Sequence, residues 1–363
     1  MARLPHRTDP PSSKSKPSGE ALRWVSDREP GLRREGPAGR FRYRQADGRP
    51  TRDVATLRRI RALAIPPGWR EVWICADAQG HLQATGRDAA GRKQYLYHPQ
   101  WRQQRSEHKF AQLPAFGRAL PRLRSTLRRC LAGDPQPTRE RVLAALVQLL
   151  DCTWMRIGNS SYARENGSYG LSTLLCRHLR LQGDALRLRF IGKTGVEHRL
   201  ALSDPRLAAI VRRCRELPGQ PLFQYLDDDG LPHRVDSSDV NAWLTARAGP
   251  GMTAKVFRTW HGSVFALDRV LDAALRDQPP DLPAIVREVA ARLGNTPAVC
   301  RASYLHPAVL DLAVALADPD ARARLRHSPW WAQRPRGRGL SQAEVRLMGL
   351  LAASSQASTP AQS

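Results

Sequence analysis

Five residues of this chain have side chains that could together act on a phosphate group. Arg156 ends an apolar stretch, and Lys193 lies at a glycine-flanked turn. Lys255 and Arg258 are three residues apart, which places them on one face of an expected helix, and Tyr304 follows a Gly-Asn-Thr-Pro segment. Guanidinium groups bind phosphate oxygens, a lysine can give up a proton and a tyrosine can act as a nucleophile. Taken singly, each residue also has an ordinary structural explanation.

The lysines stand out because the chain uses arginine almost throughout. Of its 58 Lys and Arg residues, only six are lysines, at positions 14, 16, 93, 109, 193 and 255. A GC-rich coding bias explains this ratio most simply. A lysine inside a structured segment of such a chain nevertheless indicates a place where an ammonium is needed, because lysine releases its proton far more readily than arginine.

The charge of the chain indicates a polyanionic partner. The formal net charge is +25, while 41% apolar and 25% charged residues are typical of a folded protein. The segment 92–129 has ten Lys or Arg residues and one acid, with Tyr95, Tyr97 and Trp101 interleaved. Cations and aromatic rings together suit a nucleic acid, which we favour over the alternative of a solvated basic helix face.

Other classes of protein fit the sequence poorly. No run approaches the ~20 apolar residues of a membrane span, and the first residues lack the apolar segment of a secretory signal. The six cysteines are scattered singly, and neither a phosphate-binding GxxxxGK[ST] loop nor a carboxylate cluster is present. We expect a cytoplasmic, nucleoid-associated protein without metal, cofactor or membrane partner.

The expected fold class is α+β, with a small N-terminal domain and a larger catalytic domain. Residues 1–20 are rich in proline and serine and are expected to be a disordered basic tail. The domain over 21–107 should contain an antiparallel sheet. Its apolar spacing predicts a helix over 51–63 and strands over 71–76, 81–87 and 92–98.

The second domain, over 108–327, is expected to be mainly α-helical. A helix over 138–155 with Thr138 as N-cap should precede strands over 178–202, which turn at residues 192–195. Further helices are predicted over 236–247, 254–270, 283–293 and 307–326. Residues 328–363 are expected to be a flexible tail, with at most a short amphipathic helix over 341–352.

In their order and context, five segments resemble the type IB DNA topoisomerases, and the resemblance runs from about residue 22 to 320. RIGNSSY (156–162) with GLSTL (170–174) is similar to the family's core-helix motif, and IGKTGVEH (191–198) to its catalytic-lysine hairpin. KVFRTWHGS (255–263) is similar to the second-arginine motif, and LGNTPAVCRASY (293–304) to the nucleophile segment. GRDAAGRKQYLYHP (86–99) is similar to the DNA-contacting strand of the compact poxvirus and bacterial enzymes.

The resemblance implies a mechanism and its residues. Tyr304 would attack a DNA phosphodiester and form a 3′-phosphotyrosyl bond. Arg156 and Arg258 would neutralise the charge that builds up on the phosphate, and Lys193 would protonate the departing 5′-oxygen as a general acid. Supercoils would thus be relaxed by transient single-strand cleavage and religation, without ATP or metal.

Asn295 departs from part of the family. Poxvirus and nuclear members have a histidine at this position, whereas bacterial members resemble this chain in having asparagine, which can still hydrogen-bond a nonbridging oxygen. His261 is expected to be a packing residue. The positions expected to contact DNA are Gln94, Tyr95, Tyr97, Asn159, Tyr162 and Lys255.

The implied partner is double-stranded DNA, bound by a monomer that closes as a clamp. Two alternatives remain. Tyrosine recombinases share this catalytic fold, but their second-arginine motif begins with histidine where this chain has Lys255, and their DNA-binding arm is a helical bundle where this chain has predicted strands. A non-catalytic basic DNA-binding protein would fit the composition, but it would have no need of the ordered motifs.

Overall fold

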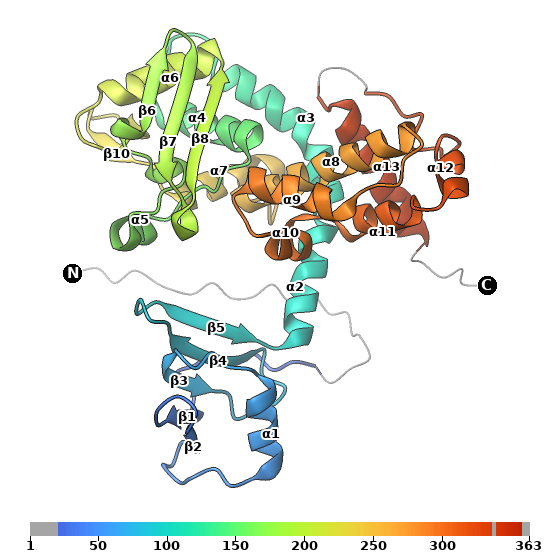
Figure 1. The fold of residues 1–363 in the computed structure, drawn as a ribbon. Helices are drawn as coiled ribbons and strands as arrows, with labels where there is room; N and C mark the ends of the chain where they lie inside the picture. Colours follow the sequence, from blue (N-terminus) through green and yellow to red (C-terminus); the bar gives the residue numbers. More distant parts are fainter. Residues whose placement is uncertain (1–20, 336–338, 358–363) are drawn as a thin grey trace. The chain divides into compact units, whose positions relative to one another are not determined.

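The computed structural model describes residues 21–335 and 339–357 (Figure 1). Its contacts divide the chain into unit 1, Met1–Glu107, and unit 2, His108–Ser363. The tail expected over 1–20 lies outside the described residues. Each unit is described by itself below.

Unit 1 is built on a five-stranded antiparallel sheet with the strand order β2-β1-β3-β4-β5. Its core consists of apolar residues from the strands and from α1, among them Leu32, Ile60 and Ile74. The predicted helix and three strands are confirmed, but the two short strands β1 and β2 were missed because arginines fill them. The bounds are β1 Leu32–Glu35, β2 Arg42–Arg44, α1 Val54–Ala62, β3 Arg70–Ile74, β4 Leu82–Arg87 and β5 Lys93–Tyr97.

Unit 2 is mainly helical. Helix α2 (Pro99–Ala111) begins in unit 1 and ends in unit 2. The remaining helices are α3 Leu113–Cys130, α4 Arg139–Thr153, α5 Ser160–Asn166, α6 Pro205–Glu216, α7 Ser237–Ala248, α8 Ala254–Leu275, α9 Leu282–Leu293, α10 Pro297–Tyr304, α11 Pro307–Ala315, α12 Pro319–Leu325 and α13 Gln342–Ala357.

Helices α4 and α8 form the centre of unit 2. Both are apolar around most of their circumference, as expected of helices that are covered on all sides. Thr138 caps α4 as predicted, because its hydroxyl accepts a hydrogen bond from the Arg141 N–H.

A three-stranded antiparallel sheet, β6 (Leu179–Gln182), β7 (Ala185–Ile191) and β8 (Glu197–Ser203), lies against α6 (Figure 1). These strands match the predicted alternation of apolar residues, whose inward side chains Leu186, Leu188 and Phe190 are buried. A short hairpin of β9 (Gln224–Leu226) and β10 (Pro232–Arg234) completes the strands of the described residues.

Two sequence-based predictions about the C-terminal third were wrong. The single helix expected over 307–326 is two helices, α11 and α12, because Pro319 lacks the N–H that a continuous helix would need. The segment 328–363, expected to be a flexible tail, contains the sixteen-residue helix α13, in which Leu347 and Leu351 are buried. The short helix predicted over 341–352 therefore agrees better with the structure than the flexible tail predicted over 328–363.

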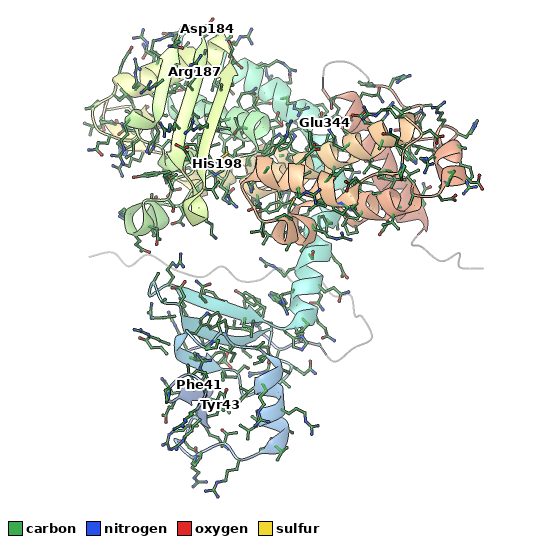
Figure 2. All side chains as sticks on the ribbon, in the orientation of Figure 1. Phe41, Tyr43, Asp184, Arg187, His198 and Glu344 are labelled. Atoms are coloured by element: carbon green, nitrogen blue, oxygen red, sulfur yellow. The ribbon has the colours of Figure 1, made fainter. Side chains whose placement is uncertain are left out.

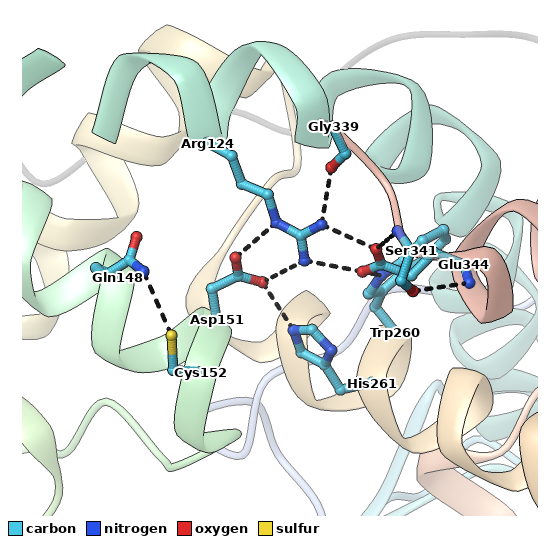
Figure 3. Close-up of polar contacts among 9 residues, drawn as sticks. All are labelled: Arg124, Gln148, Asp151, Cys152, Trp260, His261, Gly339, Ser341 and Glu344. Atoms are coloured by element: carbon cyan, nitrogen blue, oxygen red, sulfur yellow. Dashed lines mark hydrogen bonds and ion pairs between the residues drawn. The ribbon is translucent and has the colours of Figure 1, made fainter. Parts of the chain in front are cut away.

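Helix α13 is attached by charge as well as by apolar contact (Figure 3). Arg124 of α3 donates to both carboxylate oxygens of Asp151 on α4 and to both of Glu344 on α13, at 2.8–3.0 Å. The indole N–H of Trp260 donates to Glu344, and His261 hydrogen-bonds Asp151 at 2.9 Å. We call these five residues the buried network.

No helix in the described ranges is long and apolar enough to cross a lipid bilayer.

Candidate active site

A pocket of about 290 Å³ in unit 2 brings together four of the five residues predicted to be catalytic. Arg156, Lys193, Arg258 and Tyr304 all line it, although they come from a loop, a hairpin turn and two helices. Asn159 and Lys255, predicted to contact DNA, line it as well. The other lining residues are Ile157, Gly158, Ser168, Tyr169 and Ala254.

Arg156 is directed toward the pocket by the way α4 ends. Trp154 adopts a left-handed conformation (φ 59°) that stops the helix, and Met155 is buried. The next residue, Arg156, donates through both terminal nitrogens to the carbonyl oxygen of Gly294, at 3.3–3.4 Å, and through one of them to the side-chain oxygen of Asn295. The loop after α4 is thereby joined to the segment between α9 and α10.

Arg258 lies on α8 and is 2% exposed. Its two terminal nitrogens donate to the carbonyl oxygens of Trp154, at 2.6 Å, and Leu293, at 2.8 Å. Its Nε atom is buried and has no hydrogen-bond partner among the described residues. The guanidinium also lies 4.9 Å from the centre of the Tyr304 ring.

Neither arginine pairs with a carboxylate within the described part of the chain. Their partners are carbonyl and amide oxygens and, for Arg258, the side chain of Tyr304. Burying a positive charge without a negative partner is costly in free energy. An anionic group entering the pocket would supply the missing charge. Over the same residues, no three His, Cys, Asp or Glu side chains are grouped as metal ligands would be.

Lys193 occupies the turn between β7 and β8. The Gly192 N–H donates to the Val196 carbonyl at 2.7 Å, which closes the turn, and Gly195 has φ +77°, a conformation that favours glycine. The lysine side chain is exposed and lines the pocket. A short, glycine-closed turn thus presents an ammonium to Tyr304 and the two arginines.

Tyr304 is the last residue of α10, a helix that starts at Pro297 behind the N-cap Thr296. Its carbonyl oxygen accepts a hydrogen bond from the Ser263 hydroxyl at 3.3 Å. Burial alone would raise the pKa of Tyr304, but the cations of Arg258, Arg156 and Lys255 outweigh burial and hold the pKa below its ordinary value. The pocket therefore makes this tyrosine easier to deprotonate than an exposed one.

Asn295 accepts the hydrogen bond from Arg156 and leaves its amide nitrogen buried and without a partner in the described chain. It does not line the pocket itself but lies directly behind Arg156. A buried donor without an acceptor is uncommon.

His198, which was not among the predicted site residues, lies where β8 meets α9 (Figure 2). A side chain at Gly192 or at Gly294 would approach its ring within 2.5 Å, so the ring fills the space between these two glycines. Its Nε2 atom is buried and unpartnered among the described residues, and burial and the two site arginines lower the pKa of His198. The sequence feature that could have identified His198 is a polar residue at a position of β8 whose side chain is buried.

The remaining predicted DNA contacts lie in three places. Asn159 caps the start of α5 by accepting from the Ser161 N–H at 2.9 Å. Tyr162 is on α5, but its side chain lies outside what the structure describes. In unit 1, Tyr95 and Tyr97 stack on one face of β5 with ring centres 6.1 Å apart, while Gln94 donates to Asp88.

Comparisons with known proteins identify the family. The family described as eukaryotic DNA topoisomerase I, catalytic core, matches residues 98–313, and the bacterial DNA topoisomerase IB N-terminal domain matches residues 40–88. DNA topoisomerase 1B of Acanthamoeba polyphaga mimivirus is 30% identical over 78% of this chain and 87% of its own length.

Poxvirus proteins are more distant. DNA topoisomerase I of monkeypox virus and DNA topoisomerase 1B of vaccinia virus (strain Copenhagen) are each 21% identical over 67% of this chain and 76% of their own lengths. The matched ranges contain all four predicted catalytic residues that line the pocket. This chain belongs to the type IB DNA topoisomerases.

Proposed function

We propose that this type IB topoisomerase relaxes supercoiled DNA by cleaving one strand through Tyr304 and rejoining it, without ATP or a metal ion. The observation that carries the proposal is the pocket itself, where a tyrosine with a lowered pKa meets two arginines that pair with no carboxylate in residues 21–335 and 339–357. The topoisomerase matches also favour this reading over a tyrosine recombinase or a non-catalytic DNA-binding protein.

The cleavage step follows from the residues present. Tyr304 releases its proton to water, and its oxygen attacks the phosphorus. A bond from the Tyr304 oxygen to the 3′-phosphate forms and the bond from phosphorus to the 5′-oxygen breaks. Lys193 gives a proton to that leaving oxygen. Arg156 and Arg258 stabilise the charge on the nonbridging oxygens, and the free amide of Asn295 offers a further donor.

Rejoining is the same reaction in reverse. The 5′-hydroxyl attacks the phosphotyrosyl bond, returns its proton to Lys193 and releases Tyr304. Because one ester bond replaces another in each direction, no external energy source is needed. Between the two steps the free 5′ end can rotate and release supercoils of either sign.

DNA would be held by both units of a monomer acting as a clamp. In unit 1 the stacked pair Tyr95 and Tyr97 and the neighbouring Gln94 are the proposed contacts. In unit 2 the proposed contacts are Asn159 and Lys255, which line the pocket, and Tyr162 of α5. The basic segment 92–129 would add phosphate contacts that weaken with salt.

The proposal is tested with positively and negatively supercoiled plasmids, each incubated with the full chain in EDTA and without ATP. We expect both to be relaxed, and Tyr304→Phe to bind DNA but relax neither. A requirement for Mg²⁺ or ATP, or relaxation by Tyr304→Phe, would contradict the proposal.

A further inference from the structure

The end of helix α10, which carries Tyr304, is held by two side chains from other helices. Carbonyl groups in the last turn of a helix have no partner within the helix and need one outside it. The Tyr304 carbonyl is bound by Ser263 of α8, at 3.3 Å. The Ser303 carbonyl is bound by the ammonium of Lys109, which donates from α2 at 2.7 Å.

Lys109 is firmly placed for this contact. Its ammonium lies 4.1 Å from the centre of the adjacent Phe110 ring, and Phe110 is buried. That ring in turn packs edge-on against His306, two residues beyond Tyr304, with centres 5.2 Å apart. The C-terminal turn of α2 therefore contacts residues on both sides of Tyr304, the Ser303 carbonyl and the His306 ring.

We infer that Lys109 is a positioning residue, whose ammonium holds the end of α10 so that Tyr304 is aimed at the phosphate. This inference rests on the proposed function and adds a residue that does not touch the reacting atoms. A cation at a helix C-terminus also interacts favourably with the helix dipole, which strengthens the hold. A displacement of about 1 Å in a nucleophile can cost a factor of 10² in rate.

The charge on Lys109 depends on pH in the range where activity would be measured. Burial, and then the nearby cation Lys255 on α8, lower the pKa of Lys109 to about 8. Of the other titratable groups around it, His306 is neutral because burial lowers its pKa to about 4, and His108 on α2 is hydrogen-bonded to Gln112. As pH rises through about 8, Lys109 loses its charge and its hold on Ser303 weakens.

A direct contact between Lys109 and a DNA phosphate is the competing interpretation. It predicts weaker binding and a smaller salt dependence on removal of the lysine, by about one unit of the slope of log K against log salt. The positioning role predicts normal binding and slow cleavage by the bound protein. The two therefore differ in which quantity changes.

The test compares Lys109→Met, Lys109→Arg and Ser263→Ala in the full chain, with a nicked duplex oligonucleotide as the substrate. Single-turnover cleavage is measured at saturating protein between pH 6.5 and 10, together with the Kd, its salt dependence and the thermal unfolding of each variant. Ser263→Ala is the matched variant, because it releases the neighbouring carbonyl of the same helix end.

We expect Lys109→Met to cleave about 10–100-fold more slowly at pH 7 with an unchanged Kd, and Ser263→Ala to lose rate in the same way. Above pH 8 the unmutated protein should approach Lys109→Met, whereas Lys109→Arg should keep its rate because a guanidinium does not titrate there. A changed salt slope with a normal saturated rate, or normal rates in both lysine variants at every pH, would overturn the inference. Absence of cleavage by the unmutated chain would instead contradict the proposed function.

Discussion

Unit 2 contains buried and half-buried arginines whose partners differ between the network and the pocket. In the buried network, Arg124 binds two carboxylates, those of Asp151 and Glu344, whose side chains are 7% and 4% exposed. In the pocket, Arg156 and Arg258 bind carbonyl and amide oxygens, Arg258 also binds the side chain of Tyr304, and neither pairs with a carboxylate of the described residues. The two groups are joined through Trp154, whose ring stacks on His261 of the network and whose carbonyl binds Arg258.

This difference indicates that Arg124 has a structural role, whereas Arg156 and Arg258 are the arginines that we propose bind a phosphate. A buried charge must find an opposite charge or strong hydrogen bonds, and the network provides both within the protein. Among the described residues the pocket arginines have no carboxylate partner, and in the proposed function a phosphate would supply the opposite charge. The partners of an arginine, rather than its burial, therefore indicate its function in this chain.

Among the residues of the pocket, we expect the largest effect on catalysis from replacing Lys193. Lys193→Ala should slow single-turnover cleavage by roughly 10²–10⁴-fold, the usual contribution of a general acid. A substrate with sulfur in place of the scissile 5′-oxygen has a leaving group that hardly needs a proton, so Lys193→Ala should cleave it almost as fast as the unmutated protein.

Arg156→Ala and Arg258→Ala provide the control for this experiment, because they should gain much less from the sulfur substrate. Equal rescue of all three variants would show that Lys193 only binds phosphate. In that case Lys193→Arg would also retain most of the activity.

Replacing one arginine from each group should separate activity from stability. Arg258→Met should slow cleavage by about 10²–10³-fold, because it removes preorganised donors to the phosphate. Its unfolding free energy should fall by less than that of Arg124→Met, since no carboxylate loses a partner. Rates are measured by single-turnover cleavage and stabilities by urea unfolding of the two variants. An equal loss of stability in both would contradict the difference between the network and the pocket.

Arg124→Met should give the larger loss of stability. It would leave the carboxylates of Asp151 and Glu344 buried without their cation, which costs about 3–5 kcal/mol of unfolding free energy. Urea unfolding monitored by circular dichroism measures this loss. The matched variant Arg139→Met breaks only a surface pair with Asp239, whose arginine is 51% exposed, and should cost about 1 kcal/mol or less.

The smallest expected effect is on stability in acid. Burial would raise the pKa of Asp151, but hydrogen bonds and charge from His261 and Arg124 hold it down at about 2. A depressed carboxyl pKa stabilises the fold above the unfolded-state pKa near 4, and this contribution, about 2 kcal/mol, is lost as pH falls from about 4 to 2. Unfolding measured against pH should show less of this acid loss in Asp151→Asn; an identical acid profile would mean that the carboxyl is not charged in the fold.

Much of the site could be predicted from the sequence, because its residues occur in ordered motifs. Arg156, Lys193, Arg258 and Tyr304 are far apart in the chain, yet the pocket brings them together. The strands around Lys193 were predictable because their apolar residues alternate, and α9 because Pro283 and Gly294 mark its ends. Their roles in catalysis stay predictions.

What the sequence did not reveal depends on contacts between distant segments. The ring of His198 packs between two glycines at positions 192 and 294, which no local sequence pattern connects. The docking of α13 depends on Glu344 meeting Arg124, and a tail rich in arginine and proline gave no sign of that partner. The break between α11 and α12 could have been predicted, since Pro319 marks it.

The central claim, that the pocket cations activate Tyr304 as the nucleophile, is tested most directly by locating the covalent bond to DNA. The full chain is incubated with an oligonucleotide whose downstream fragment, which carries the new 5′-hydroxyl, diffuses away after cleavage. The protein–DNA adduct is then digested and mapped by mass spectrometry. Two tyrosines, Tyr169 and Tyr304, line the pocket among the residues that the structure describes. The nucleotide should be on Tyr304, joined through the 3′-phosphate; an adduct on Tyr169, or one joined through a 5′-phosphate, would contradict the account.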